Sequence, residues 1–495
     1  MNTPLRRVGL TMLVMVVLLL ANITYIQMVK ADDYRADSRN QRVLFDEYSR
    51  ERGKIISSDN KLVATVTPTN DRLKFLRQYP LGAAFAPITG YYSVRYGSRA
   101  LERSEKEILD GSDDRLFVRR LSDLITGRDP RGGNIQTTVD SRIQQTAYDA
   151  MTSAGYTGAV VAIRPQTGEI LAMVSTPSYD PNPLSSHNGD EQEKAWSSYR
   201  DDKAKPLTNR AIQETYQPGS TFKLVVTAAA LEDGMTKDEQ LTAAPSVKLP
   251  GTRDADLENF AGSHCGPGDS PTASLELALS VSCNTAFAEL AGKLGPEKLR
   301  EQATKFGIGQ TDLQIPMGVA ESNIGPLPDA AALYQTGIGQ RDVRLTPLQD
   351  AMIVSAIANG GTLMRPQLVQ KVLAPDLSEM SKKFDTDELG RAMSTSNAAA
   401  LRDMMKKSED NTRGNGKVNG LTIASKTGTA EHGTDPKNTP PHAWYVAFAP
   451  ADNPQIAVAV LVENGGNRGL AATGSSVAAS VGRATINAMP GIGGR

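Results

Sequence analysis

One long apolar segment near the N-terminus restricts how this chain can fold more than any other feature. Residues 8–29 contain no charged side chain, and a helix of this length spans about 33 Å, enough to cross a bilayer. Arg6 and Arg7 precede it, so the positive-inside rule predicts a cytoplasmic tail over residues 1–7 and an exported body. A cleaved signal peptide is the alternative. We predict an uncleaved, single-pass anchor, because the segment is longer than an h-region and no small-x-small cleavage site follows it.

The composition of the rest of the chain predicts a globular body of two or three domains. Hydrophobic residues make up 39% and charged residues 22% of 495 positions, which is too long a chain for one ordinary domain. Lys and Arg (54) balance Asp and Glu (55) without a long run of one sign, so we expect no nucleic-acid surface. The four histidines and two cysteines show no HExxH or CxxC spacing, so we expect no metal site.

The two cysteines, Cys265 and Cys283, lie 18 residues apart in the part of the chain predicted to be exported. Disulfides persist outside the cytoplasm, so a bridge between the two is compatible with the predicted location. Sequence spacing alone does not establish whether the sulfurs come within bonding distance. A bridge would hold the segment around Cys283.

Between the anchor and the main body, residues 30–135 are predicted to form a small mixed domain, which we call the pedestal. Residues 53–66 read as a β-hairpin, since two short apolar runs flank a Ser/Asp/Asn turn. Residues 102–109 and 116–125 have the pattern of helices. The turn-rich residues 129–133 predict the boundary at which the pedestal ends.

The following residues, 136–488, are richer in Ala, Val and Gly and predict one larger α+β domain. Its first strands form a hairpin, and its last strands form a second one, with helices between them. We therefore expect the first and last strands to share one sheet. Residues 185–205 are polar and are predicted to be mobile, and residues 489–495 are predicted to form a disordered tail. The expected strands cover residues 158–163, 169–174, 421–429, 443–448 and 455–462.

The first candidate for chemistry is the pair Ser220 and Lys223. Ser220 opens an apolar helix, and positions three apart share a helix face, so the two side chains can approach each other. Burial would lower the pKa of the lysine and leave a neutral amine able to activate the serine. The alternative is an ordinary helix cap followed by a surface lysine. A second S-x-x-K pair, Ser58 and Lys61, lies in the predicted pedestal turn and is attributed to turn chemistry.

The second candidate is the pair Ser282 and Asn284, which follows an apolar run. The hydroxyl of Ser282 has the chemistry to relay a proton, and the Asn284 amide to donate to a substrate carbonyl. The alternative is that both are ordinary polar residues of a loop.

The third candidate is the run Lys426, Thr427, Gly428 and Thr429 at the end of an alternating strand. The ammonium and the two hydroxyls offer partners for a carboxylate. The glycine would let a peptide backbone approach the strand closely, as in β-augmentation. The alternative is a charged strand end.

Taken together, the three motifs resemble those of the serine penicillin-binding proteins and β-lactamases, where S-x-x-K, S-x-N and K-T-G occur in this order. Residues 216–223, 345–349, 359–361 and 425–430 resemble class B penicillin-binding proteins in particular. The likeness is strongest over residues 138–486. The short pedestal is similar to that of the PbpA-like division proteins of actinobacteria.

The resemblance implies a β-lactamase/transpeptidase-like fold, with an antiparallel sheet packed between helices, and a peptidoglycan D,D-transpeptidase activity. Ser220 would form the acyl-enzyme with Lys223 as base, and D-alanine would leave through Ser282. The N–H groups of Ser220 and Thr429 would form the oxyanion hole, and Lys426, Thr427 and Thr429 would bind the terminal carboxylate. The implied partners are stem peptides, β-lactams, a SEDS-type glycan polymerase and division proteins. No cofactor is implied.

Four alternative functions are less consistent with this pattern. A β-lactamase or β-lactam sensor has the same motifs, but class A β-lactamases also carry Glu-x-x-Leu-Asn, which does not occur between Ser282 and Lys426. A non-catalytic scaffold at the septum is disfavoured because all three motifs are intact. A Ser-His-Asp hydrolase lacks its G-x-S-x-G elbow here. A P-loop ATPase is disfavoured because residues 414–417 are followed by Val418, where the motif requires Ser or Thr.

Overall fold

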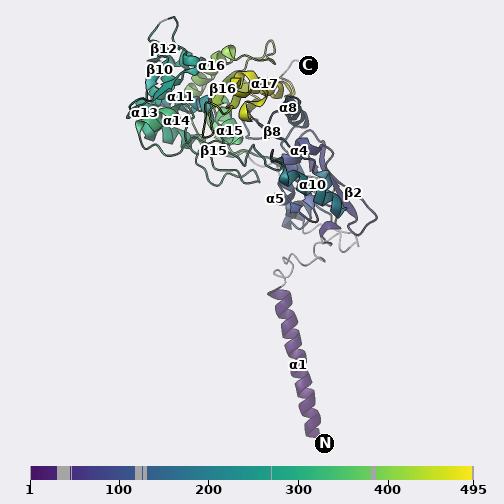
Figure 1. The fold of residues 1–495 in the computed structure, drawn as a ribbon. Coiled ribbons are helices and arrows are strands. Elements are labelled where there is room, and N and C mark those ends of the chain that lie inside the picture. Colours follow the sequence, from purple (N-terminus) through teal and green to yellow (C-terminus); the bar gives the residue numbers. More distant parts are fainter. Residues whose placement is uncertain are drawn as a thin grey trace.

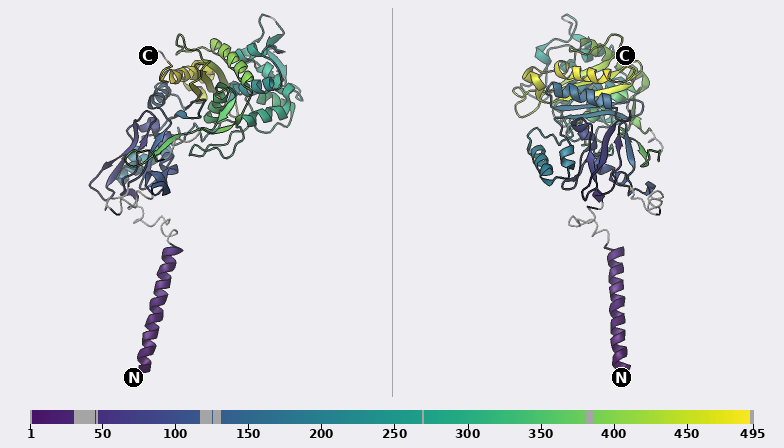
Figure 2. Two further views of the ribbon diagram at one scale, coloured as in Figure 1. Left: turned by 180° about the vertical axis from the view of Figure 1, so that it is seen from behind. Right: turned by 90° about the vertical axis from the view of Figure 1, so that its right-hand side faces the viewer.

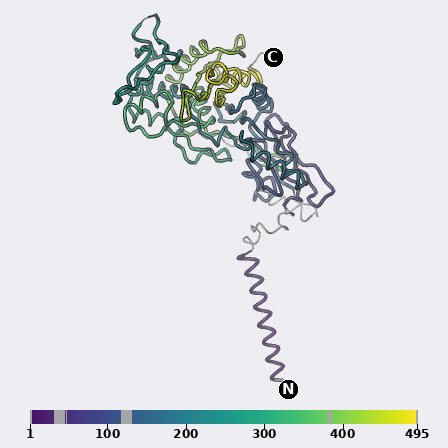
Figure 3. The backbone as a smooth tube through the Cα atoms, viewed as in Figure 1, coloured from purple at the N-terminus to yellow at the C-terminus, as the bar shows by residue number. Residues whose placement is uncertain are grey.

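The computed structural model describes residues 2–30, 45, 47–116, 125, 131–268, 270–380 and 386–492. A long helix, α1 (Asn2–Met28), stands apart from a small mixed domain, and a larger domain lies beyond it (Figure 1). The same order is visible from behind and from the side (Figure 2) and in the backbone trace (Figure 3). Within the described residues, Thr3–Met28 is the one stretch of helix long and apolar enough to cross a membrane, and its side chains are not buried.

The pedestal is built on a five-stranded sheet in the order β14-β6-β1-β2-β3. The predicted hairpin is confirmed, since β1 and β2 pair antiparallel with Ile55 opposite Ala64. The sheet does not end at the predicted boundary near residue 135, because β14, from far along the chain, pairs with β6. The strands are β1 (Ile55–Ile56), β2 (Leu62–Pro68), β3 (Phe75–Gln78), β6 (Asn134–Thr137) and β14 (Val369–Leu373).

Helices cover the pedestal sheet, and one of them differs from the prediction. Residues 185–205 were expected to be mobile, yet α10 occupies most of them, and Asn188 caps its N-terminus. The helix is held because Trp196 packs edge-on against Tyr91, a long-range contact that the polar composition does not reveal. The helices are α4 (Gly82–Thr89), α5 (Leu101–Ser104), α6 (Lys106–Leu109), α9 (Asn182–Ser185) and α10 (Gly189–Asp201).

Two other pedestal helices were predicted. The helix expected over residues 102–109 is present as α5 and α6, which meet at Glu105. The helix expected over residues 116–125 falls mostly outside the described residues. The buried carboxylate of Glu102 accepts hydrogen bonds from the guanidinium groups of Arg52 and Arg77, at 2.6 Å each. These ion pairs connect the segment before β1 and strand β3 to α5.

The large domain contains a five-stranded antiparallel sheet in the order β16-β17-β18-β7-β8. The prediction that the first and last strands share a sheet is confirmed, because β18 pairs with β7, with Val460 opposite Val160. Strand β16 is at the edge of the sheet. The strands are β7 (Gly158–Ile163), β8 (Ile170–Thr176), β16 (Ala424–Ala430), β17 (His442–Ala449) and β18 (Ile456–Val462).

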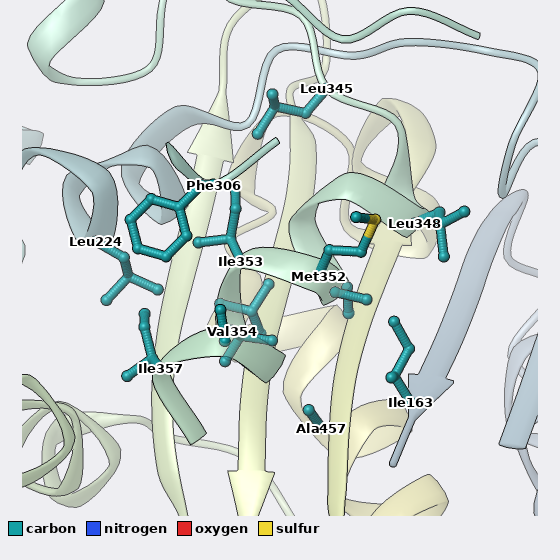
Figure 4. Packing of buried hydrophobic residues seen from close by; sticks show 14 of the residues in the cluster. Ile163, Leu224, Phe306, Leu345, Leu348, Met352, Ile353, Val354, Ile357 and Ala457 are labelled. Carbon is teal, nitrogen blue, oxygen red and sulfur yellow. The ribbon is translucent and has the colours of Figure 1, made fainter. Parts of the chain in front are cut away.

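Both faces of this sheet are buried by helices, which gives the predicted α+β architecture. Helix α15 (Pro347–Ala358) packs on one face, where Met352, Ile353 and Val354 join a cluster with Ala457 and Ile163 (Figure 4). Helices α8 (Ser141–Ser153) and α17 (Ala479–Asn487) pack on the other face. The strands are therefore apolar on both sides, with every residue of β7, β8 and β18 buried.

The remaining helices lie beyond the face that α15 covers. The helix expected over residues 221–231 begins as a tight turn, η2 (Gly219–Phe222), and continues as α11 (Lys223–Glu232). Helices α12 (Leu275–Ser280), α13 (Asn284–Lys305), α14 (Ala330–Gly337) and α16 (Thr395–Asn411) complete this part. Two-stranded ladders join β4 (Tyr92–Ser93) to β5 (Gly97–Ser98), β9 (Gln240–Thr242) to β12 (Thr272–Ser274), β10 (Ser246–Lys248) to β11 (Asp256–Glu258), and β13 (Thr362–Met364) to β15 (Glu388–Arg391).

The C-terminal residues differ in part from the predicted disordered tail. Met489 is buried, and Ile492 packs against the same apolar cluster that lies under α8 and α17. These two apolar side chains explain why the chain stays docked for several residues after α17 ends. Residues 493–495 lie outside the described residues.

Candidate active site

Ser220 lies in the turn Gly219–Phe222, which we call the serine turn. The turn presses against the edge strand β16, since a Cβ added to Gly219 would lie 2.5 Å from the Thr429 carbonyl oxygen. Gly219 also has a φ of +56°, so glycine suits this position on both counts. Ser220 itself is half-buried.

Lys223 is the first residue of α11 and is fully buried, so it is not a surface lysine. Its Nζ donates to Asn284 Oδ1 and to the Ser282 carbonyl oxygen, at 2.8 Å each, and lies 3.4 Å from Ser282 Oγ. Burial, together with the nearby charge of Lys426, holds the pKa of Lys223 well below its usual range. Lys223 Nζ makes no hydrogen bond to Ser220 Oγ in the described part of the chain, so the predicted activation of Ser220 by this lysine stays a prediction.

Lys426 also contacts Ser282, the serine that Lys223 approaches. Its Nζ donates to Ser282 Oγ at 2.9 Å and to the Thr427 carbonyl oxygen at 2.8 Å. Burial lowers the pKa of Lys426 to about 7. Ser282 adopts a φ of +62°, which is unusual for a residue with a side chain and marks a position fixed by its surroundings.

The segment around Ser282 is anchored at two points. The structure joins Cys265 and Cys283 in a disulfide, with the Cα atoms 5.8 Å apart. The Oδ1 of Asn259 accepts hydrogen bonds from the backbone N–H groups of Asn284 (2.8 Å) and of the next residue (3.0 Å). Asn259 had no signal in the sequence, because a single asparagine between a short strand and a helical turn has no pattern.

Asn284 itself has two contacts that restrict its role. Its Oδ1 accepts from Lys223, and one N–H of its amide donates to the Glu258 carbonyl oxygen at 3.0 Å. The second N–H of the amide makes no hydrogen bond to the described residues, so its donation to a substrate carbonyl stays a prediction.

Strand β16 forms one wall of the site and carries the third motif. Thr427 and Thr429 are half-buried, whereas Lys426 and Gly428 are buried. The expected approach of a peptide to Gly428 stays a prediction, and the structure gives this glycine a packing role. A Cβ there would lie 2.6 Å from the Pro218 carbonyl oxygen and 3.0 Å from the Thr221 side chain, so the glycine makes room for the serine turn.

Behind β16 a buried ionic network holds the strand, and the sequence did not indicate it. Glu409, on α16, accepts hydrogen bonds from Tyr445 Oη (3.1 Å) and Arg483 Nε (2.8 Å) and from the hydroxyl of Ser425, the neighbour of Lys426. Arg483 is fully buried and also donates to several backbone carbonyls of residues 412–415. The network ties α16 and α17 to the position of Lys426.

Two cavities lie near these elements. One, of about 360 Å³, continues from the end of β16 and includes Gln217, Leu257, Arg344 and His432 in its lining. A larger cavity of about 510 Å³ lies between the pedestal and residues 206–209 and contains none of the motif residues. The smaller cavity contains none of them either, but its lining includes Glu431, which directly follows β16, so it lies next to the strand that carries the third motif.

Comparison with known proteins identifies the family. Residues 158–487 match the model of the penicillin-binding protein transpeptidase domain, and residues 52–135 match that of the penicillin-binding protein A dimerisation domain. The chain belongs to the penicillin-binding protein family. Among curated relatives of this penicillin-binding protein, the peptidoglycan D,D-transpeptidase PbpA of Mycobacterium tuberculosis and that of Mycolicibacterium smegmatis are each 55% identical over 99% of both chains.

Solved structures agree with the sequence relatives. The ceftriaxone acyl-enzyme complex of penicillin-binding protein A from M. tuberculosis matches with a TM-score of 0.87 and 55% identity, covering 90% of this chain and 99% of that one. Its penicillin G acyl-enzyme complex matches with a TM-score of 0.85 and 54% identity, covering 89% and 99%. This penicillin-binding protein thus has the fold and the two-domain organisation of that enzyme.

Proposed function

We propose that this penicillin-binding protein is a peptidoglycan D,D-transpeptidase that forms an acyl-enzyme on Ser220 and is acylated there by β-lactams. The observation that carries the proposal is the contact of two buried lysines, Lys223 and Lys426, with the hydroxyl of Ser282 beside the serine turn. The names of the mycobacterial relatives and the acyl-enzyme structures of penicillin-binding protein A support it.

In the acylation step, Ser220 Oγ attacks the carbonyl carbon of the penultimate D-alanine of a stem peptide. The neutral amine of Lys223 accepts the hydroxyl proton, and the N–H groups of Ser220 and Thr429 stabilise the oxyanion. One such donor is typically worth about 3–4 kcal/mol of barrier. The C–N bond then breaks, Ser282 delivers a proton to the leaving amine, and Lys223 replaces the proton on Ser282.

In the second step an amine from a neighbouring stem peptide attacks the ester carbonyl of the acyl-enzyme. The attacking amine loses its proton to Lys223, and the proton returns to Ser220 Oγ as the ester bond breaks, which completes a cross-link. Lys426, Thr427 and Thr429 bind the terminal carboxylate of the donor stem. Class B penicillin-binding proteins use such cross-linking in cell-wall synthesis. We propose that this chain does so during cell division.

The same proposal includes the topology in the membrane. Arg6 and Arg7 precede the apolar stretch of α1, so residues 1–7 stay in the cytoplasm and the two domains are exported. A transpeptidase of this kind acts on the stems of newly made glycan strands. We therefore assign the supply of new strands to a SEDS-type glycan polymerase that works with division proteins.

Peptide mapping of a β-lactam adduct tests the proposal. The full chain in detergent is treated with penicillin G, digested and analysed by mass spectrometry, with the Ser220→Ala variant as control. We expect the adduct on Ser220 and none in the variant. An adduct on another residue, or no adduct on folded protein, would contradict the proposal. Loss of the label within seconds would favour the β-lactamase alternative, and full complementation of a deletion strain by Ser220→Ala would favour the scaffold.

A further inference from the structure

A carboxyl group lies buried directly beneath the serine turn. Asp350, on α15, is 1% exposed, and its Oδ2 is 2.9 Å from the hydroxyl oxygen of Thr221, the residue after the nucleophile. Its other oxygen, Oδ1, has no hydrogen-bond partner in the described part of the chain. The surrounding α15 side chains belong to the apolar cluster against the sheet (Figure 4). A carboxyl group in such a place is costly unless it has a role or stays neutral.

The hydrogen bonds that Thr221 can make decide which protonation state of Asp350 fits the structure. The hydroxyl oxygen of Thr221 also lies 3.2 Å from the Pro218 carbonyl oxygen, which only accepts. A threonine hydroxyl has one proton, so it cannot donate to both Pro218 and an ionised Asp350. If the Asp350 carboxyl is protonated on Oδ2, it donates to Thr221, and Thr221 donates to Pro218. Every one of these short contacts then contains a proton.

This chain of hydrogen bonds ends where the serine turn meets β16. A Cβ at Gly428 would lie 2.6 Å from the Pro218 carbonyl oxygen, so Pro218 is packed against the strand that carries Lys426 and Thr429. The separation between the N–H groups of Ser220 and Thr429 depends on this packing. A loosened turn would therefore misplace both the nucleophile and the proposed oxyanion hole, and a displacement of about 1 Å can cost 100-fold in rate.

We propose that Asp350 is a positioning residue that, as a neutral carboxylic acid, locks the serine turn against β16 through Thr221 and Pro218. The proposal deepens the proposed function, since it concerns how Ser220 is acylated. Ionisation of Asp350 would draw the Thr221 proton away from Pro218 and leave two oxygen atoms facing each other without a proton between them. The lock therefore holds at low pH and opens when the carboxyl loses its proton.

The electrostatic surroundings agree with a neutral carboxyl. Burial raises the pKa of Asp350 to about 7, with the Thr221 hydroxyl acting in the opposite direction. The ionisable side chains of the neighbouring elements have partners of their own: Lys223 on α11 contacts Asn284, Lys426 on β16 contacts Ser282, and Glu409 on α16 pairs with Arg483, next to Tyr445 of β17. Helix α15 otherwise faces apolar residues of β7, β17 and β18.

The test compares Asp350→Asn with Asp350→Ala in the full chain, using the rate of acylation by a fluorescent penicillin between pH 6 and pH 9. The asparagine amide donates to Thr221 at every pH, as the protonated acid does at low pH. We expect Asp350→Asn to match the wild type within about threefold at pH 6 and to exceed it about three- to tenfold at pH 8.5. We expect Asp350→Ala to lose about tenfold or more throughout, in the acylation step rather than in penicillin affinity.

Two further variants make the result specific. Asp312→Asn, at an exposed carboxylate, should leave the pH profile of the wild type unchanged. Thr221→Val removes the hydroxyl that links Asp350 to Pro218, so adding Asp350→Asn to it should change the profile by less than twofold. The inference is overturned if Asp350→Asn has the wild-type pH profile, if it fails to fold, or if it loses as much as Asp350→Ala. A wild type that is not acylated on Ser220 would instead contradict the proposed function.

Discussion

Ser282 Oγ accepts a hydrogen bond from Lys426 Nζ at 2.9 Å, although 144 residues separate the two in the chain. The contact joins a loop of the helical part to the edge strand of the sheet, so it closes the site across the two halves of the domain. It also brings a second amine to a hydroxyl that Lys223 already approaches. Predictions about this penicillin-binding protein follow from the protonation of these groups and from what holds them in place.

Replacing Lys223 tests its role as base. Lys223→Met should lower the rate of acylation by a β-lactam by about 100- to 10,000-fold, the usual contribution of a positioned base. Lys223→Arg should lose as much, because a guanidinium does not give up its proton at working pH. The rates are measured by rapid mixing with a fluorescent penicillin, after melting curves show that both variants fold. Near-normal acylation by the arginine variant would rule out Lys223 as the base.

The pH dependence of acylation should have two limbs. The rate should rise with pH as Lys223, whose pKa is depressed by burial, loses its proton and becomes a base. It should fall as Lys426 loses the charge that attracts the substrate carboxylate, around pH 7. Ionisation of Asp350 lowers the rate in the same pH range, so the test uses the Asp350→Asn background. There Lys426→Arg keeps its charge at all accessible pH values and should move the remaining falling limb to higher pH. A falling limb at the same pH in this variant would show that Lys426 is not its cause.

The sequence predicted those parts of the molecule whose signal is local. The motifs indicated Ser220, Lys223, Ser282, Asn284 and Lys426 as site candidates, because each motif combines reactive side chains with a distinctive helix start, loop or strand. The antiparallel sheet was predictable from its alternating or continuously apolar strands. The structure brings these residues into one site, but the pairing of both lysines with Ser282 depends on side-chain conformations that spacing does not encode.

The residues that support the site were not predictable, because they act over long sequence separations. Asp350 and Glu409 lie on helices that look ordinary, and their partners Thr221 and Arg483 come from other segments. Residues 185–205 were misjudged for the same reason, since the aromatic contacts of Trp196 come from the pedestal. A buried polar pair leaves no periodic pattern in a single sequence.

Breaking the ionic network behind β16 should destabilise the large domain. Arg483→Met leaves the carboxylate of Glu409 buried without its cation, and removing one partner of a buried pair typically costs about 3–5 kcal/mol. We expect the double variant Glu409→Gln/Arg483→Met to recover part of that loss, because it removes both charges. Melting temperatures of the full chain check this. A double variant that melts at or below the melting temperature of Arg483→Met would contradict the explanation.

Opening the Cys265–Cys283 disulfide should lower the stability of the protein and leave the loop of Ser282 less firmly held. The bridge closes a loop with a sequence separation of 18 residues, which corresponds to about 3 kcal/mol by the chain-entropy model. The double variant Cys265→Ser/Cys283→Ser should melt at a lower temperature and be acylated more slowly, because Ser282 is adjacent to Cys283. Reductant should slow acylation of the wild type but not of this variant. Equal effects of reductant on both would show that the bridge is not responsible.

Lys426 should lower the free energy of unfolding of the protein, although the site needs this lysine for function. A lysine whose pKa falls from 10.5 to about 7 in the folded state opposes folding whenever it is charged, and that shift corresponds to roughly 5 kcal/mol as an upper limit. Lys426→Met removes the buried charge, so we expect it to raise the free energy of unfolding by about 1–4 kcal/mol at pH 6.5. The same variant should lose acylation of Ser220.

The pH dependence of this gain identifies its cause. Between pH 7 and pH 10.5 unfolded wild type binds a proton at Lys426 that the folded protein does not, so wild-type stability rises with pH over that window. The methionine variant lacks this dependence, and its advantage should therefore shrink from pH 6.5 to pH 9.5. Urea unfolding of both proteins at the two pH values measures the difference. An advantage that stays constant would mean that packing, rather than the charge of Lys426, is responsible.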